Sequence, residues 1–239
     1  MQFVNIDKLD TQYENYPFPH VVIDNFLKSD VVDVVLKNIN NLQDNEANSV
    51  FTDPNSKYEY NKYAFSDNYG VYLKQLFIEL NSDEFVKKLE KLTGIDDLIK
   101  GDIQLQGAGI HRIKNKGFLQ LHTDFNTYVN SDNIKLDRRI NLLIYMNPNW
   151  KQEYHGELCL CDKVKGICTK KIQPILNRCV IFNTTNKSIH GHPKPLCVPD
   201  NITRQSIALY YYTKNNNGNV DFEGDRPHNT VWYKLAGLN

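Results

Sequence analysis

The sequence predicts an α+β protein whose core is a double-stranded β-helix, the cupin-like jelly roll, flanked by an N-terminal helical layer. Two patterns carry this prediction. Apolar residues recur at helical spacing only before Gly101, and after it the chain breaks into short strand-like runs separated by Gly, Asn and Pro. A block of helices followed by a block of short strands favours segregated layers over an alternating α/β fold.

The first hundred residues are expected to form one strand and three helices. Residues 16–27 begin with prolines and continue as a short apolar strand, and residues 31–39 take up helical spacing. Two further helices, at 71–80 and 83–92, are separated by Asn-Ser, where Ser82 is the expected N-cap.

Between these helices, residues 45–68 are expected to form a long loop. They are rich in Asn, Asp, Ser and Tyr and show little periodicity. Long loops in compact domains often act as binding lids, and Tyr58, Tyr60 and Tyr63 would let this loop close over an extended chain.

The strands of the core are expected after Gly101. These apolar runs lie at residues 103–106, 118–122, 140–146, 157–160, 170–173, 179–182 and 205–212. The chain is expected to be one domain over 1–239, with supporting elements in 1–100, the jelly-roll core in 101–215 and a C-terminal extension in 216–239. That extension has a turn-like sequence and ends in a short strand or edge segment.

The charge balance argues against nucleic acid or an anionic membrane as a partner. Lys+Arg and Asp+Glu number 28 each, so any anionic ligand must be met locally. No apolar run reaches the roughly 18 residues of a membrane span, and the N-terminus lacks a signal-peptide layout, so a cytoplasmic location is expected. The oligomeric state stays open.

Five cysteines, an odd number, argue against a disulfide framework. Cys159 and Cys161 alternate along an apparent strand and are expected to be small apolar or surface strand residues.

The pattern that carries most chemistry is His122-Thr-Asp124. Residues i and i+2 of a strand point to one side, so the two side chains could meet one metal ion. A third ligand could come from Ser-Ile-His190-Gly-His192, where either histidine is possible because the two are again two apart. Two histidines and one carboxylate form the facial triad of non-heme Fe(II) oxygenases. Zinc is disfavoured because neither Cys-x-x-Cys nor His-Glu-x-x-His occurs.

Charged and imidazole side chains elsewhere have simpler interpretations. Arg204 begins an apolar strand, where an unpaired charge would be costly unless the side chain reaches water. Asp137, Arg138 and Arg139 are expected to form a solvated turn at the start of a strand, although either arginine could meet a substrate. The remaining histidines are expected to be packed or surface residues: His20, His111, His155 and His228.

Ordered blocks at 118–124, 138–150, 156–162 and 188–213 resemble the 2-oxoglutarate- and Fe(II)-dependent dioxygenases, in particular their prolyl-hydroxylase-like branch. Residues 16–27 also resemble the opening of bacterial relatives. The resemblance implies that His122, Asp124 and His190 bind the iron. Pro193 supports His190 over His192, because a proline directly after His192 ends a strand ladder. His192 would then support the ligands or face the substrate.

The same resemblance implies a 2-oxoglutarate site. Arg204 would pair with the distal carboxylate of 2-oxoglutarate, for which its planar fork and permanent charge are suited. Tyr145 would contact the cosubstrate and Leu158 would wall its pocket, although a core tyrosine and a core leucine describe these two positions equally well.

The implied reaction uses Fe(II), 2-oxoglutarate and O2, with ascorbate as a candidate reductant, and releases succinate and CO2 as an unactivated C–H bond is hydroxylated. A prolyl residue in a peptide or protein is the expected substrate. A free amino acid, a sugar or another metabolite is the alternative. Different classes also remain: a non-catalytic jelly-roll binding module, a metal-dependent cupin isomerase, or a zinc hydrolase.

Overall fold

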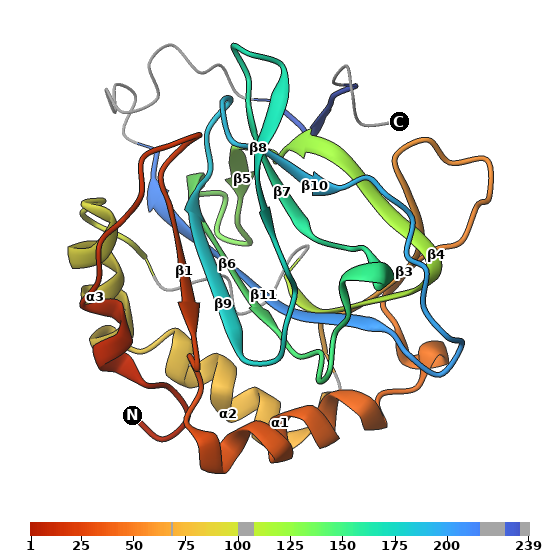
Figure 1. Ribbon diagram of the computed structural model, residues 1–239. Helices are drawn as coiled ribbons and strands as arrows, with labels where there is room; N and C mark the ends of the chain where they lie inside the picture. The colour runs from red at the N-terminus through yellow and green to blue at the C-terminus, as the bar shows by residue number, and fades with distance from the viewer. Residues whose placement is uncertain (68, 100–107, 216–227, 235–239) are drawn as a thin grey trace.

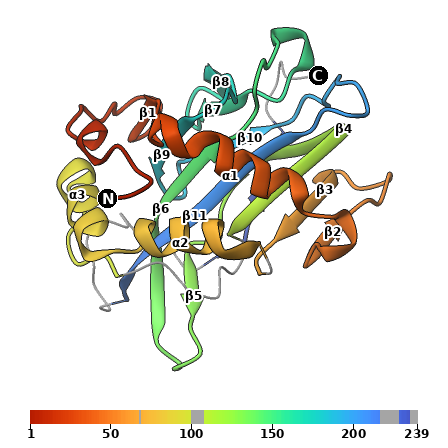
Figure 2. The ribbon, with the colours of Figure 1, turned by 90° about the horizontal axis from the view of Figure 1, so that it is seen from below.

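The computed structural model describes residues 1–67, 69–99, 108–215 and 228–234. An antiparallel sheet curls around an internal cavity, and helices cover one outer face of the curl (Figures 1 and 2). This is the jelly-roll core with a flanking helical layer that the sequence predicts. The strand expected at 103–106 lies outside the described residues, as does most of the C-terminal extension.

The main path of the sheet has antiparallel neighbours throughout. Its order is β1 (His20–Asp24), β9 (Arg178–Asn183), β6 (Lys135–Tyr145), β11 (Arg204–Lys214), β4 (Gly109–Thr123), β10 (Ile189–His192), β7 (Leu158–Asp162) and β8 (Ile167–Ile172). Short strands add to its margins: β2 (Ser49–Phe51), β3 (Glu59–Phe65), β5 (Thr127–Val129) and β12 (Val231–Trp232). The strand predictions that fall on described residues are confirmed, although β4 begins well before the expected residue 118 and β6 well before the expected residue 140.

Strand β4 joins the two halves of the curl. Its first residues pair with β11 and its last residues pair with β10. Near the middle, Lys116 has a positive φ of 64°, and a Cβ on Gly117 would lie 2.9 Å from the carbonyl oxygen of Tyr60. A glycine is therefore needed where β4 bends against β3. The bend carries the end of β4, with His122, into the interior of the curl.

Side chains of β6 point alternately into the hydrophobic core and into the cavity. Ile140 and Leu142 pack into the cluster shared with the helices, whereas Asn141 and Tyr145 line the cavity. Successive residues of a strand point to opposite faces, so one strand serves both purposes.

The helices α1 (Ser29–Asn41), α2 (Gly70–Leu80) and α3 (Asp83–Thr93) confirm the helical predictions. Short 3-10 turns, η1 (Ile6–Leu9), η2 (Asp44–Glu46) and η3 (Gln152–Tyr154), lie between elements. The hydroxyl of Ser82 accepts a hydrogen bond from the Phe85 amide at 3.2 Å, so Ser82 is the N-cap of α3. Among the described residues, no helix is both long enough and apolar enough to span a membrane.

The prediction of a long loop at 45–68 is wrong for most of that segment. Its described residues form η2 and the β2–β3 hairpin, and β3 pairs along β4. The register of this pairing shifts between Tyr60 and Lys62, and Asn61 between them has a positive φ of 52°. Because such a bulge breaks the two-residue alternation that signals a strand, the local sequence hides it.

The prediction that Cys161 is a simple apolar or surface strand residue is also wrong, because Cys161 forms a disulfide with Cys168. The two are register partners across the β7–β8 hairpin, where opposed Cβ atoms come within disulfide reach. The cysteine count and the N-terminal sequence carried no information about this local pairing. Cys159 and Cys179 are free and buried, as small apolar residues would be.

Candidate active site

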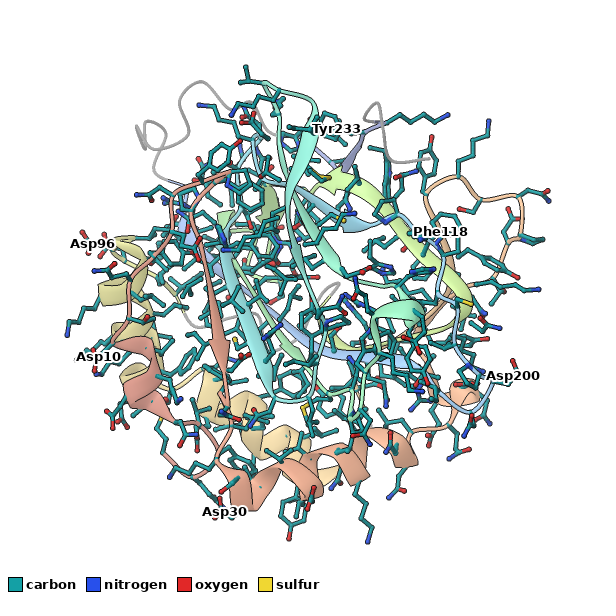
Figure 3. The ribbon with its side chains drawn as sticks, in the orientation of Figure 1. Asp10, Asp30, Asp96, Phe118, Asp200 and Tyr233 are labelled. Atoms are coloured by element: carbon teal, nitrogen blue, oxygen red, sulfur yellow. A yellow bond between two sulfur atoms is a disulfide. The ribbon has the colours of Figure 1, made fainter. Side chains whose placement is uncertain are left out.

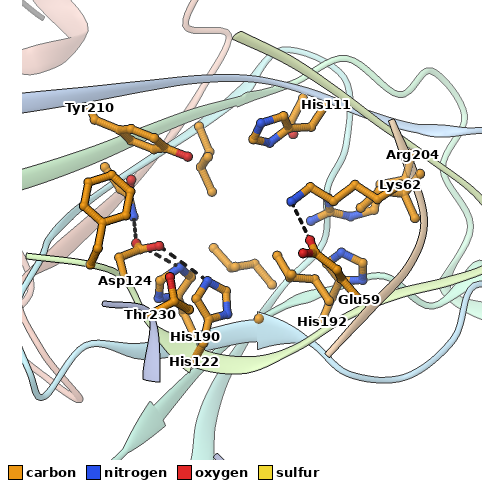
Figure 4. Close-up of a pocket in the computed structure, with 18 of the residues that line it drawn as sticks. Glu59, Lys62, His111, His122, Asp124, His190, His192, Arg204, Tyr210 and Thr230 are labelled. Atoms are coloured by element: carbon orange, nitrogen blue, oxygen red, sulfur yellow. Dashed lines mark hydrogen bonds and ion pairs between the residues drawn. The ribbon is translucent and has the colours of Figure 1, made fainter. Parts of the chain in front are cut away.

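A cavity of about 210 Å³ lies inside the curl of the sheet (Figure 4). Its wall contains every site residue that the sequence predicts: His122, Asp124, Tyr145, Leu158, His190, His192 and Arg204. These residues come from β4, β6, β7, β10 and β11 and from the turn after β4. Figure 4 shows the carboxylate and two of the histidines at one side, and Arg204 with His192 at the other.

The first side holds a group able to bind a metal ion. One ligand atom each from His122, Asp124 and His190 lies within 4.8 Å of the others. Both Nε2 atoms stand 3.5 Å from an oxygen of Asp124. The histidines are register partners across β4 and β10, with ring centroids 4.4 Å apart. The pairing of two sheet strands therefore sets the arrangement, and no flexible loop is needed to bring the histidines together.

Backbone carbonyls orient both imidazoles. The Nδ1 of His122 lies 2.8 Å from the carbonyl oxygen of Gln120, and that of His190 lies 2.9 Å from the carbonyl oxygen of Ser188. When a carbonyl oxygen accepts a hydrogen bond from Nδ1–H, the proton stays on Nδ1 and Nε2 is free to bind metal. Metal-binding histidines commonly make such a hydrogen bond with their other ring nitrogen. Burial lowers the pKa of His190 to about 4, so its ring is neutral near pH 7.

Asp124 is held as a carboxylate. Burial alone would raise its pKa, but Arg138 and the two imidazoles outweigh burial and hold the pKa well below the usual value. Asn141 donates a hydrogen bond to Oδ2 at 2.6 Å, and Arg138 makes an ion pair with the same oxygen at 3.1 Å. The charged form that a cation needs is thus stabilised before any metal binds.

The prediction of a solvated turn around Arg138 is wrong. Arg138 is 1% exposed and lies within β6, with its guanidinium 3.4 Å from the ring centroid of Tyr210 and 4.6 Å from that of Phe125. It also donates to Asn141 at 2.6 Å. Two aromatic faces and the Asp124 carboxylate compensate the buried charge, and none of these partners is near Arg138 in sequence.

His192 stands apart from the metal-binding group. A bulge shifts the β10–β4 register between His190 and His192, and Gly191 between them has a φ of 156°. A Cβ on Gly191 would lie 2.7 Å from the carbonyl oxygen of Gln120, so only glycine fits. The strand ends at His192, directly before Pro193, as expected. Neither ring nitrogen of His192 has a partner among the described residues.

The other side of the cavity holds a buried cation without a counter-ion. Arg204 is 4% exposed, and no carboxylate of the described residues forms an ion pair with it. Its Nε donates to the carbonyl oxygen of Gly156 at 2.8 Å, and its terminal nitrogen lies 3.4 Å from the Tyr145 hydroxyl. Burial lowers the pKa of Arg204, the direction expected for a cation removed from water. An anionic ligand would supply the missing charge.

These residues fit Fe(II) and 2-oxoglutarate. The nitrogen and oxygen donors, with both Nε2 atoms turned to one carboxylate, form the donor set of the facial triad. The unpaired guanidinium and the Tyr145 hydroxyl suit a carboxylate at the far side. Leu158 supplies apolar wall in the same cavity.

The sequence did not reveal several residues that line the same cavity. Glu59 and Lys62 come from β3, whose bulge hides the strand pattern, and Trp232 comes from β12, which pairs with the end of β4. Polar and apolar residues alternate between 59 and 63 only when the bulge residue is left out of the count. The alternation could therefore have predicted the strand only if the bulge had been known in advance.

The sequence model of the 2OG-Fe(II) oxygenase superfamily matches residues 108–212, from the start of β4 through most of β11. No curated protein sequence matches the chain. The fold is similar to that of a Trichoplax adhaerens prolyl hydroxylase in complex with a hypoxia inducible factor peptide fragment. The TM-score is 0.59 at 21% identity, over 87% of this chain and 86% of the other.

It is similar also to a Pseudomonas putida prolyl-4-hydroxylase, with a TM-score of 0.56 at 15% identity over 87% of this chain and 97% of the other. A third structure is a Phytophthora capsici prolyl 4-hydroxylase, with a TM-score of 0.55 at 17% identity over 91% of this chain and 65% of the other. Residues 108–212 of the chain are accordingly similar in sequence to the 2OG-Fe(II) oxygenase superfamily, and the chain has a prolyl-hydroxylase-like fold.

Proposed function

We propose that the enzyme hydroxylates a prolyl residue of a peptide or protein, with His122, Asp124 and His190 binding Fe(II). The observation that carries the iron site is the convergence of two imidazole nitrogens on one ionised carboxylate, within the segment that matches the 2OG-Fe(II) oxygenase sequence model. Three protein ligands leave positions for a cosubstrate and dioxygen.

The far carboxylate of 2-oxoglutarate would bind Arg204 and the Tyr145 hydroxyl. Arg204 is buried and has no carboxylate partner among the described residues, so a dicarboxylate would relieve an uncompensated charge. Leu158 would pack on the chain between the two carboxylates and keep water out.

The bound iron and cosubstrate would supply the oxidising chemistry, while the protein fixes geometry around them. Asp124 is held in place by Asn141 and Arg138, and His122 and His190 are held by backbone carbonyls. These contacts would keep the ligands oriented as the reaction proceeds.

The prolyl substrate is supported by the fold, because the solved structures named above are prolyl hydroxylases, one of them with a peptide bound. The test is succinate release from purified protein with Fe(II), 2-oxoglutarate and ascorbate, over capped prolyl peptides, free amino acids and sugars. We expect turnover with prolyl peptides and a product heavier by one oxygen. Turnover confined to a free amino acid or a sugar would replace the prolyl substrate while keeping the oxygenase.

A further inference from the structure

One wall of the cavity is not used by iron or 2-oxoglutarate in the proposed function. It is built by β3 and by β12 with the residue before it, and the two strands pair one after the other with the edge of β4 that lies opposite β10. This wall contributes Glu59, Lys62, Thr230 and Trp232 to the cavity lining. Figure 4 shows Lys62 and Glu59 facing Asp124 across the cavity.

The part of this wall nearest the metal site is aromatic. Trp232 is the register partner of His122, and the two ring centroids are 5.0 Å apart. The ring of Tyr58, 50% exposed, packs against Trp232, with ring centroids 4.9 Å apart. The Tyr233 amide donates to the carbonyl oxygen of Leu121 at 2.8 Å and anchors β12 (Figure 3 labels Tyr233). A fixed aromatic surface thus borders a proposed iron ligand.

The part farther from the metal site is polar. The ammonium of Lys62 pairs with Oε2 of Glu59 at 2.9 Å, and the two side chains are 14% and 18% exposed. Lys62 also lies over the ring of Phe51 at 4.9 Å. A lysine has three N–H donors and a glutamate has several acceptor sites. The ion pair uses only some of them, so a donor and an acceptor remain for a ligand.

We propose that the wall formed by β3 and β12 is the substrate-binding surface, with the prolyl ring against Trp232 and with the backbone N–H and C=O of the residue after proline on Glu59 and Lys62. This inference rests on the proposed function and deepens it. The reacting C–H must lie at the metal, and Trp232 is the wall residue that touches a proposed metal ligand. The reacting ring therefore belongs on the aromatic part.

An extended residue matches the polar part because its own N–H and C=O point to the same side of the chain and so offer one donor and one acceptor to adjacent groups. For the residue after proline, Lys62 would donate to the carbonyl oxygen, and Glu59 would accept from the N–H. The prolyl nitrogen carries no hydrogen, so the nearest backbone N–H belongs to the residue after proline. A substrate without these groups would cover the ion pair and leave its remaining donors and acceptors unpaired, which weakens binding.

The polar contact is tested with acetyl-Ala-Ala-Pro-Ala-Ala-amide and with the same peptide carrying an ester in place of the amide after proline. We expect the ester to raise KM at least fivefold in the wild type and to make no difference in Glu59→Ala. Lys62→Met should raise the peptide KM at least tenfold with little change in the KM for 2-oxoglutarate. The exposed Lys87 gives the matched control, Lys87→Met, which should behave as the wild type.

The aromatic contact is tested with Trp232→Ala and Trp232→Phe. We expect the alanine variant to raise the peptide KM about tenfold and the phenylalanine variant to restore it, because an aromatic face is what the ring needs. Val231→Ala, at a position 39% exposed on the same strand, is the matched control and should leave the peptide KM unchanged.

The inference is wrong if amide and ester peptides have equal KM in the wild type, or if Lys62→Met raises only the KM for 2-oxoglutarate. Turnover of free proline without turnover of the capped peptides also overturns it. Loss of the anaerobic Fe(II)-2-oxoglutarate complex in Trp232→Ala would show that this ring acts through His122 and not on substrate. If the wild type itself forms no such complex, the proposed function fails. If the wild type forms the complex but the peptide KM is unaltered in every variant, the proposed substrate-binding surface is wrong and the proposed function still stands.

Discussion

Arg138 shows how a single buried cation can prepare a metal ligand. It lies between Phe125 and Tyr210 and pairs with Asp124, so it keeps the carboxylate ionised and fixed. The sequence places it in a charged run that is typical of a turn. Its compensating partners come from β11 and from the turn after β4, and no local pattern could have predicted that they would meet it.

Arg138→Met is expected to lower metal affinity about 10–100-fold, because Asp124 loses the cation that holds it. Isothermal titration of the metal-free protein with Mn(II) or Co(II) measures this. Arg178→Met removes an ion pair to the half-exposed Asp24 and serves as the control with wild-type metal affinity. Equal affinities in the wild type and Arg138→Met would show that Arg138 only fills space.

Gly191 is the residue that lets β10 approach β4. Gly191→Ala is expected to lower the free energy of unfolding by about 3 kcal/mol or more, because the new Cβ would meet backbone atoms. Gly166 also has a positive φ, but a Cβ added there would have nothing within 4 Å, so Gly166→Ala should cost only about 1–2 kcal/mol. Urea unfolding measures both, and equal losses would contradict a close contact at Gly191.

At the scale of elements, the sequence predicts those that carry their own periodic signal. Helices α1 to α3 and strands β6, β7, β9 and β11 are confirmed, since their apolar residues repeat at 3.6 or fill a buried strand. Strand β3 was missed because a bulge at Asn61 interrupts the alternation, and the pairing of β12 with β4 depends on a partner far away in sequence. Elements defined by distant partners cannot be predicted from local sequence.

The same distinction explains the site. His122, Asp124, His190 and Arg204 stand in recognisable motifs, and the structure brings them to one cavity. Glu59, Lys62 and Trp232 lie in elements without such motifs, and only the folded sheet places them there.

The N-cap of α3 gives a test at this scale. Ser82→Ala is expected to lower the free energy of unfolding by about 1 kcal/mol, because the Phe85 amide loses its acceptor. Ser131→Ala, in an exposed turn, should change it little. Thermal or urea unfolding of both variants measures these changes in the free energy of unfolding. Equal changes for the two serines would contradict the role of Ser82 as the N-cap.

At the scale of the whole molecule, the proposed metal ligands join β4 to β10, where the two halves of the curl meet. A ligand that binds only the folded state stabilises it, by about 2.7 kcal/mol at 100 times its Kd. For a chain of this size we therefore expect Mn(II) to raise Tm by roughly 5–10 °C. Removal of the metal with EDTA should reverse the shift, and Asp124→Ala should show none. The same shift in Asp124→Ala would place the metal elsewhere.

The central claim is that this cavity binds Fe(II) and 2-oxoglutarate together. The most direct measurement is anaerobic addition of both to purified metal-free protein, recording the weak visible charge-transfer band of the iron-2-oxoglutarate chelate. We predict a band in the wild type that is lost in Asp124→Ala and that needs more 2-oxoglutarate in Arg204→Met. A well-folded wild-type protein that gives no band would contradict the assignment of the site.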